Sequence, residues 1–203
     1  MEKWEKLADR KKVDLVMERL NAKGINAYYA EDGKEALDKM LELIPEGSEV
    51  FEATSTTLQS IGFTDIMKEG KRYVDAVKQV REINDPTERD RLRRKTTIAQ
   101  FAVGSVHAVT EDGELIAASM SGSQLAPYVY TAERVVLVAG THKIVNSVEE
   151  GIKRIKEHTV PLENKRMMAA YGIGTALNKL LIMYGDKTKG RISIIFVNRV
   201  LGF

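Results

Sequence analysis

Residues 109–145 read VTEDGELIAASMSGSQLAPYVYTAERVVLVAGTHKIV, and this stretch decides the fold. Its run RVVLVAG, residues 134–140, is almost continuously apolar, which is typical of a strand buried on both faces of a parallel sheet. An acidic turn and a Ser-Gly-Ser loop precede this strand, and a Thr-His-Lys segment follows it. Because α/β domains hold polar ligands at the carboxyl ends of their strands, the stretch predicts a fold and the place of a site.

The rest of the chain alternates between strand and helix patterns, which predicts an α/β fold with a Rossmann-like, mostly parallel sheet flanked by helices. We expect the neighbouring strands within residues 101–118 and 180–197 to add antiparallel pairing at an edge or in a small lobe. The predicted strands are 25–30, 49–53, 101–109, 115–118, 134–139, 180–184 and 192–197, and the predicted helices are 2–23, 34–44, one from residue 58, 73–83, 87–98, 147–158 and a short one near 164–170.

The length of 203 residues suits one substantial core and is short for two full domains. We expect an N-terminal amphipathic helix within residues 1–24, ended by Gly24, and then a single α/β domain over residues 25–203. Hydrophobic residues at 43% and charged residues at 30% are the balance of an ordinary globular protein.

Charge and composition exclude several classes of protein. The net charge of +2 is too small to indicate nucleic-acid binding, and we interpret the basic segment RDRLRRK, residues 89–95, as a solvated helix face. The absence of cysteine excludes disulfides, thiolate nucleophiles and cysteine-ligated iron–sulfur clusters within this chain. The start MEKWEKLADRKK lacks the apolar core of a signal peptide, and no apolar run approaches the ~18 residues of a membrane span. We therefore expect a cytoplasmic protein without a membrane partner.

A cluster of hydroxyl side chains follows the predicted strand 49–53 and precedes a helix. Hydroxyls and free backbone N–H groups at a helix start favour an anion, whereas a simple helix cap needs only one of them. The cluster lacks the glycine spacing and lysine of a P-loop, so ATP is not implied. The predicted ligand-binding residues here are Thr54, Ser55, Thr56 and Thr57.

Two further segments carry groups suited to an anion. In the loop of residues 121–124 a glycine permits close backbone approach, and hydroxyl and amide groups can bond phosphate or carboxylate oxygens. After the strand 134–139, Lys143 can neutralise an anion and His142 can move protons near neutral pH. The alternatives are a plain loop and side chains that point to solvent. Three scattered histidines without ligand spacing predict no metal site. The loop residues are Ser121, Gly122, Ser123 and Gln124.

The acidic turn supplies the candidate catalytic groups. Glu111 or Glu114 can act as nucleophile or general base if burial tunes the pKa of its carboxyl group. The alternative is an exposed hairpin turn whose acids lie in water. We interpret His107, just before this turn, as a structural histidine.

An ordered set of segments resembles the lactate-utilisation (LUD) domain family over most of the chain, most strongly from about residue 84 onward. The segments are AVTEDGEL at 108–115, VVLVAG at 135–140 with the following HKIV, the helix with Glu149 and Arg154, AYGIG at 170–174, and the closing Gly202 and Phe203. The resemblance implies an α/β fold related to ribose-5-phosphate isomerase, glucosamine-phosphate deaminase and the CoA-transferases, which bind anionic ligands in loops at strand ends.

The resemblance also implies a pathway. Lactate-utilisation members belong to a system that oxidises L-lactate to pyruvate alongside iron–sulfur partner proteins, and this cysteine-free chain resembles the cluster-free component. Two positions depart from the family pattern. The loop Ser121 to Gln124 replaces an Asn-Gly-Asn-Arg loop of many relatives, and His142 replaces an asparagine before Lys143. The altered loop can hydrogen-bond a ligand but carries no charge.

We therefore expect a LUD-domain protein that binds a small anionic organic ligand, either a carboxylate such as lactate or a phosphorylated or CoA-linked metabolite, without a cofactor. Three alternatives stay open. In a CoA-transferase-like enzyme Glu111 or Glu114 would accept the acyl group, and a sugar-phosphate-isomerase-like enzyme would bind a phosphosugar at residues 54–57. A non-catalytic partner would only assemble with iron–sulfur oxidoreductase subunits. A homodimer would cover exposed apolar strands.

Overall fold

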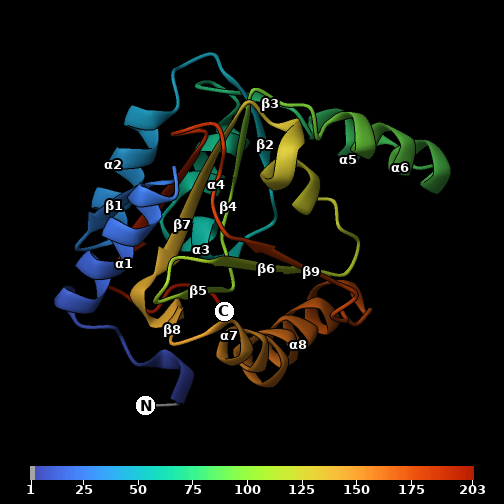
Figure 1. Cartoon of the computed structure of the whole chain (residues 1–203). Helices are drawn as coiled ribbons and strands as arrows, with labels where there is room; N and C mark the ends of the chain where they lie inside the picture. The colour runs from blue at the N-terminus through green and yellow to red at the C-terminus, as the bar shows by residue number, and fades with distance from the viewer. Residues whose placement is uncertain (1–2) are drawn as a thin grey trace.

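The computed structural model describes residues 3–203, and its centre is a six-stranded, fully parallel sheet that we call sheet A (Figure 1). The strand order is β1-β10-β7-β4-β2-β3. Helices lie on both sides of this sheet, which confirms the predicted α/β fold. The strands of sheet A are β1 (Asn26–Ala30), β2 (Glu49–Glu52), β3 (Val74–Asp75), β4 (Phe101–Gly104), β7 (Arg134–Gly140) and β10 (Ile192–Val197).

Strand β7 is buried on both faces, as its continuous apolar run predicts. Val135, Leu137 and Ala139 belong to one hydrophobic core. Val136 and Val138 belong to the core on the opposite face. This alternation is the two-residue period of a strand, applied to a sheet whose two faces are both covered.

Three helices cover the face of sheet A that carries Val136 and Val138. They are α2 (Gly33–Leu43), α3 (Thr56–Ser60) and α4 (Phe63–Glu69). Helix α2 begins where the Asp32 side chain accepts hydrogen bonds from two backbone N–H groups of the first turn. Met40 of α2 and Phe63 of α4 are completely buried against the sheet.

The other face of sheet A packs against helix α1 (Arg10–Ala22) and a second, smaller sheet, sheet B. Sheet B has the order β8-β5-β6-β9, with β8 parallel to β5 and the remaining pairs antiparallel. Gly113, at φ +87°, supplies the left-handed residue of the β5–β6 turn. This sheet confirms the predicted small lobe. Its strands are β5 (Ala108–Thr110), β6 (Leu115–Ser119), β8 (Ile144–Val145) and β9 (Lys179–Met183).

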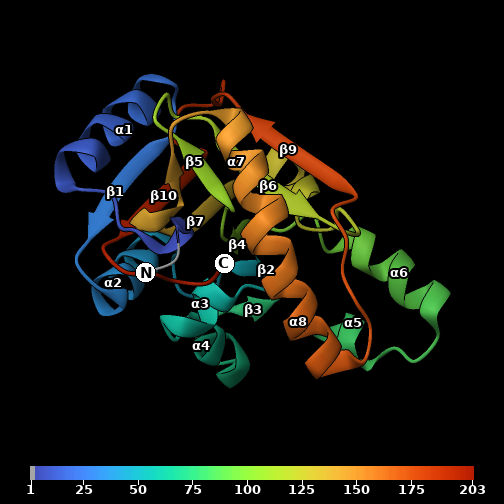
Figure 2. The ribbon, with the colours of Figure 1, turned by 90° about the horizontal axis from the view of Figure 1, so that it is seen from below.

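A long helix covers the outer face of sheet B (Figure 2). It runs without a break through α7 (Val148–Arg154), a π-helical turn η4 (Ile155–Thr159) and α8 (Val160–Tyr171). The predicted separation of this segment into a helix over 147–158 and a short one near 164–170 is wrong, although Pro161 lies between them. Proline removes a backbone donor and crowds the preceding turn of an α-helix, and the wider π turn directly before α8 accommodates that loss.

Two predicted strand assignments are corrected. Residues 101–109 form two strands, β4 in sheet A and β5 in sheet B, because the chain crosses between the sheets at residues 105–107. Strands β9 and β10 do not pair with each other: β9 pairs with β6, and β10 lies between β1 and β7. An apolar run in the sequence indicates a buried strand, but it does not show which other strand pairs with it.

Two predicted helices are shorter than expected. The predicted helix 73–83 is strand β3 followed by α5 (Lys78–Glu82), and α6 (Pro86–Lys95) follows it. Helix α1 begins only after Asp9, whose side chain caps it, and a 3-10 turn, η1 (Lys3–Glu5), precedes it. Residues 1 and 2, at the start of the predicted helix, lie outside the described residues. Helices α5 and α6 project from the body in both views (Figures 1 and 2).

None of the helices formed by residues 3–203 combines the length and the apolar character needed to cross a membrane.

Candidate ligand-binding site

A cavity of about 640 Å³ lies at the carboxyl ends of β2, β4 and β7. This volume falls in the range of about 300–1,000 Å³ that is usual for small-molecule sites. The walls come from the β2–α3 turn, the crossing segment 105–107, the segment after β6, helix α8, the α5–α6 arm and the C-terminal Phe203. The position is the one that parallel α/β sheets give to polar ligands.

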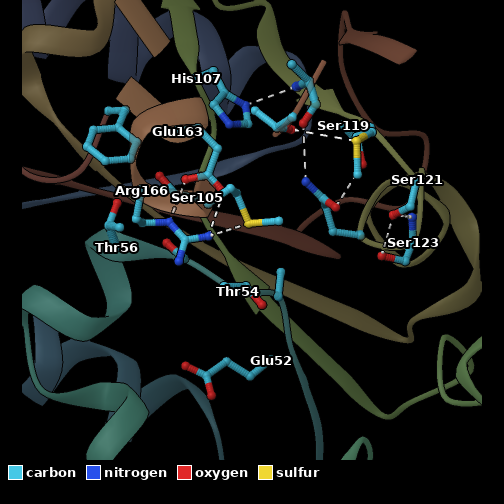
Figure 3. A pocket seen from close by; sticks show the side chains of 18 of the residues that line it. Glu52, Thr54, Thr56, Ser105, His107, Ser119, Ser121, Ser123, Glu163 and Arg166 are labelled. Atoms are coloured by element: carbon cyan, nitrogen blue, oxygen red, sulfur yellow. Dashed lines mark hydrogen bonds and ion pairs between the residues drawn. The ribbon is translucent and has the colours of Figure 1, made fainter. Parts of the chain in front are cut away.

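The cavity brings together most of the ligand-binding residues predicted from sequence. Gly122 shapes its loop without lining the wall, and His142 is buried beside the site rather than in it. Figure 3 shows several of these residues around the paired side chains of Glu163 and Arg166. The predicted residues on the wall are Thr54, Ser55, Thr56, Thr57, Ser121, Ser123, Gln124 and Lys143.

The hydroxyl residues after β2 have two roles: one caps helix α3, and others line the cavity. Ser55 caps α3, because its Oγ accepts a hydrogen bond from the backbone N–H of Leu58 at 3.3 Å. Thr57 turns inward and is 1% exposed. Its Oγ1 donates to the carbonyl of Leu201 at 3.2 Å and lies 3.4 Å from Ser105 Oγ. A single cap therefore does not account for the whole cluster.

Lys143 follows β7 in the short 3-10 turn η3 (Thr141–Lys143) and is 1% exposed. Its Nζ donates to Ser105 Oγ at 3.1 Å and to Thr57 Oγ1 at 3.3 Å. Within residues 3–203 no carboxylate forms an ion pair with it. Burial, together with the nearby charge of Arg154, holds the pKa of Lys143 well below its usual range.

Arg154 is a second buried cation beside the cavity. Its Nη1 donates to the His107 carbonyl at 2.7 Å and to Thr159 Oγ1 at 3.2 Å. Its Nε and Nη2 have no hydrogen-bond partner in the described chain, and burial lowers the pKa of Arg154 to about 10. Two buried cations without a paired acid make this region strongly electropositive.

The two histidines near these cations are neutral. His107 lines the cavity, and burial with the charges of Lys143 and Arg154 lowers its pKa to about 3. Its Nδ1 accepts a hydrogen bond from the Ala118 N–H at 3.0 Å, so the remaining ring proton lies on Nε2. Burial and the same two charges lower the pKa of His142 to about 2, and its ring stays neutral at pH 7.

The segment after β6 holds its own shape through internal hydrogen bonds. Ser119 Oγ accepts from the Gly122 N–H at 2.8 Å and donates to Gln124 Oε1 at 3.0 Å. The Gln124 amide donates to the Ala118 carbonyl at 3.2 Å, which leaves the hydroxyls of Ser121 and Ser123 on the wall, 3.1 Å apart (Figure 3). Gly122 is at φ +91°, which explains the glycine here.

Most carboxylates at or next to the cavity already have a partner within the protein. Arg166 forms a bidentate pair with Glu163, with both N···O distances 2.7 Å. Arg81 pairs with Asp75 at 2.5 Å. Glu52 accepts a short hydrogen bond from Thr64, and its burial raises the pKa of its carboxyl group. The acids therefore do not neutralise the remaining cations.

Sequence reasoning missed Arg89 and Arg93, which line the cavity from α6. The sequence predicts a solvated helix face here, and α6 has no buried residue. The four-residue spacing of the two arginines places them on one side of the helix. Neither has an ion-pair partner within residues 3–203. Only the path of the α5–α6 arm, which the sequence does not reveal, brings this side to the cavity.

Glu111 and Glu114 do not line the cavity. They pair instead with helix α1 and its C-cap: Lys12 of α1 pairs with Glu111 at 2.5 Å, and the C-cap residue Lys23 pairs with Glu114 at 2.8 Å. Burial alone would raise the pKa of Glu114, but hydrogen bonds from Lys23 and Thr110 outweigh it and lower that pKa. The catalytic role considered for these acids stays a prediction.

A parallel sheet flanked by helices, with a cavity at its carboxyl edge, defines a protein of the α/β class. The chain belongs to the LUD domain family, whose sequence model matches residues 13–197. This match confirms the resemblance seen in the sequence and makes the chain a domain protein related to lactate utilisation. No curated protein matches the sequence.

One solved structure supports the fold. A DUF162 family protein from Deinococcus radiodurans is similar at a TM-score of 0.51 and 13% identity, over 95% of this chain and 99% of that one. The eIF2B delta protein from Chaetomium thermophilum is similar over 53% of this chain and 46% of its own, at 15% identity and a TM-score of 0.31. At these identities the first likeness concerns the fold alone.

Proposed function

We propose that this LUD-domain protein binds a small anionic organic ligand in the cavity and acts in L-lactate utilisation beside iron–sulfur partner subunits. One observation carries the binding part of the proposal. The cavity is lined by Arg89, Arg93 and the buried Lys143, and none of the three has a carboxylate partner within residues 3–203. Cations that line a cavity without an acid partner favour an anionic guest.

The size of the cavity bears on the kind of anion. A three-carbon acid such as lactate would fill only a small part of about 640 Å³. The arginines of α6 and the lysine after β7 come from different walls. A phosphorylated or CoA-linked metabolite, with several negative oxygens, can engage both walls, so we favour it over lactate alone.

A thermal-shift screen with lactate, pyruvate, ribose 5-phosphate and acetyl-CoA tests the proposal. A ligand at ~100 times its dissociation constant adds ~2.7 kcal/mol to the stability. The informative variant combines Arg89→Gln and Arg93→Gln. We expect it to lose affinity about tenfold, equivalent to ~1.4 kcal/mol, because two cations leave the wall.

The chain offers a matched control on the same helix. The pair Arg91→Gln and Lys95→Gln removes the same charge from α6 at the same four-residue spacing, but neither residue lines the cavity. We expect this control to keep nearly all of the wild-type affinity, since charges in open solvent are screened. Equal losses in the two double variants would show that only the net charge matters. If none of the four compounds stabilised the wild type, the binding proposal would fail.

A further inference from the structure

Lys143 is buried and held by two hydroxyl groups, although neutralising the charge of a bound anion would require neither. Its Nζ contacts two hydroxyls, Ser105 Oγ at 3.1 Å and Thr57 Oγ1 at 3.3 Å, and forms no ion pair with an acid of the described chain. The side chain is 1% exposed, yet it lines the cavity. Its two hydrogen bonds therefore fix the orientation of the amino group at the cavity wall.

The charge state of this lysine follows from its neighbours. Burial disfavours the ammonium form, and the buried Arg154 guanidinium disfavours it further. Neutral His107 offers no compensating negative charge. The lowered pKa of Lys143 raises the share of its free amine near neutral pH, and the free amine is the nucleophilic form of a lysine.

We propose that Lys143 is a catalytic nucleophile that forms an imine with an aldehyde or ketone bearing a carboxylate or phosphate group. The inference rests on the proposed binding of an anion in the same cavity. The free-amine form of Lys143 would take the carbonyl end of such a compound. Arg89 and Arg93 would take its anionic end, because they line the same cavity without acid partners of their own within residues 3–203.

The reaction needs no oxidant or cofactor. The Nζ lone pair attacks the carbonyl carbon, and one N–H proton passes to the carbonyl oxygen to give a carbinolamine. Loss of that hydroxyl with the second proton releases water and leaves the carbon–nitrogen double bond. The hydroxyls of Ser105 and Thr57 can each donate and accept, so they are placed to carry these protons between nitrogen and oxygen.

Borohydride trapping tests the proposal, since it reduces an imine to a stable secondary amine. The full chain is incubated at pH 7 with pyruvate, ribose 5-phosphate or neutral acetone, then reduced and mapped by peptide mass spectrometry. We expect Lys143 to be labelled at least about tenfold more than exposed Lys165, because solvated lysines are protonated at this pH. Labelling by pyruvate identifies a carboxylate partner, and labelling by ribose 5-phosphate identifies a phosphate partner. Acetone should label poorly.

Two variants serve as controls. Lys143→Met should abolish the adduct and still fold, because an apolar side chain of similar size replaces an unpaired buried amine at little cost. Lys165→Arg should leave the Lys143 adduct unchanged. The same compounds are tested for binding without borohydride. Binding without an adduct at Lys143, or label spread evenly over exposed lysines, would overturn the imine and leave anion binding intact. Neither binding nor label would overturn both proposals.

Discussion

At the scale of single residues, the electrostatics of this protein are set by cations that are buried without acids. Lys143 and Arg154 each bond only to neutral oxygens in the described chain. Their charges and the burial they share keep His107 and His142 neutral. Such an arrangement costs folding free energy, and proteins retain strained or unpaired polar groups mainly where function uses them.

His142 should make the protein sensitive to mild acid. The folded-state pKa of about 2 lies below the unfolded value of about 6.5, so below pH 6.5 the unfolded chain binds a proton that the folded chain does not. Stability is complete above pH 6.5 and falls with decreasing pH. At pH 5 this one histidine should cost about 2 kcal/mol. Urea unfolding at pH 7 and pH 5 measures the loss.

The variant His142→Asn isolates this effect, because asparagine does not titrate. We expect the variant to lose about 2 kcal/mol less than the wild type between pH 7 and pH 5. Glu114 and Glu149, whose pKa values are lowered below 4.5, lose their contribution mainly at lower pH and affect both proteins alike. Identical losses in the two proteins would refute the assignment to His142.

At the scale of secondary-structure elements, helix α1 and the β5–β6 turn hold each other through charges. Lys23, the C-cap residue of α1, donates from its Nζ to Glu114 Oε1 at 2.8 Å and to the Asp112 carbonyl. The Glu114 side chain is 11% exposed, so this pair is better shielded than an ordinary surface pair. The acids of this turn therefore anchor the N-terminal helix to sheet B.

A double-mutant cycle of Lys23→Met and Glu114→Gln measures this anchoring. We expect each single change to reduce the free energy of unfolding by about 1–3 kcal/mol, with a favourable coupling of at least about 0.5 kcal/mol. Binding of the cavity ligand should be unchanged in all three proteins. A Glu114→Gln variant of normal stability that had lost its ligand or its turnover would instead support the acid–base role considered from the sequence.

Sequence patterns predict features fixed by local chemistry and miss those fixed by long-range packing. The apolar run of β7 and the polar groups at strand ends are visible in the sequence, and the residues predicted from them include Thr57 and Lys143, which line the cavity. The partners of β9 and β10 were not readable, because an apolar strand fits several neighbours equally well. The sequence also did not predict the π turn before Pro161. A proline indicates the end of an α-helix, and no local pattern shows that a wider turn lets the helix continue through it.

At the scale of the whole molecule, the cavity is assembled from segments far apart in the chain. Thr57 follows β2, Ser105 leads from sheet A to sheet B, Lys143 follows β7, and Arg166 lies on the helix that covers sheet B. Both sheets therefore contribute to the walls. A ligand that contacts several of these segments should reduce the motion of elements that pack weakly against the rest of the protein.

Helix α6 is the element on which this restraint should be clearest. It has no buried residue and projects from the body, so its amides should exchange rapidly with solvent in the free protein (Figure 1). An anion bound by Arg89 and Arg93 would join α6 to the cavity. We expect hydrogen–deuterium exchange in residues 86–95 to slow about tenfold at saturation, equivalent to ~1.4 kcal/mol, while exchange in α2, which does not line the cavity, stays unchanged. If a ligand bound and α6 exchanged as fast as before, the arm would not belong to the site, and recognition would rest on Lys143 and its hydroxyl neighbours alone.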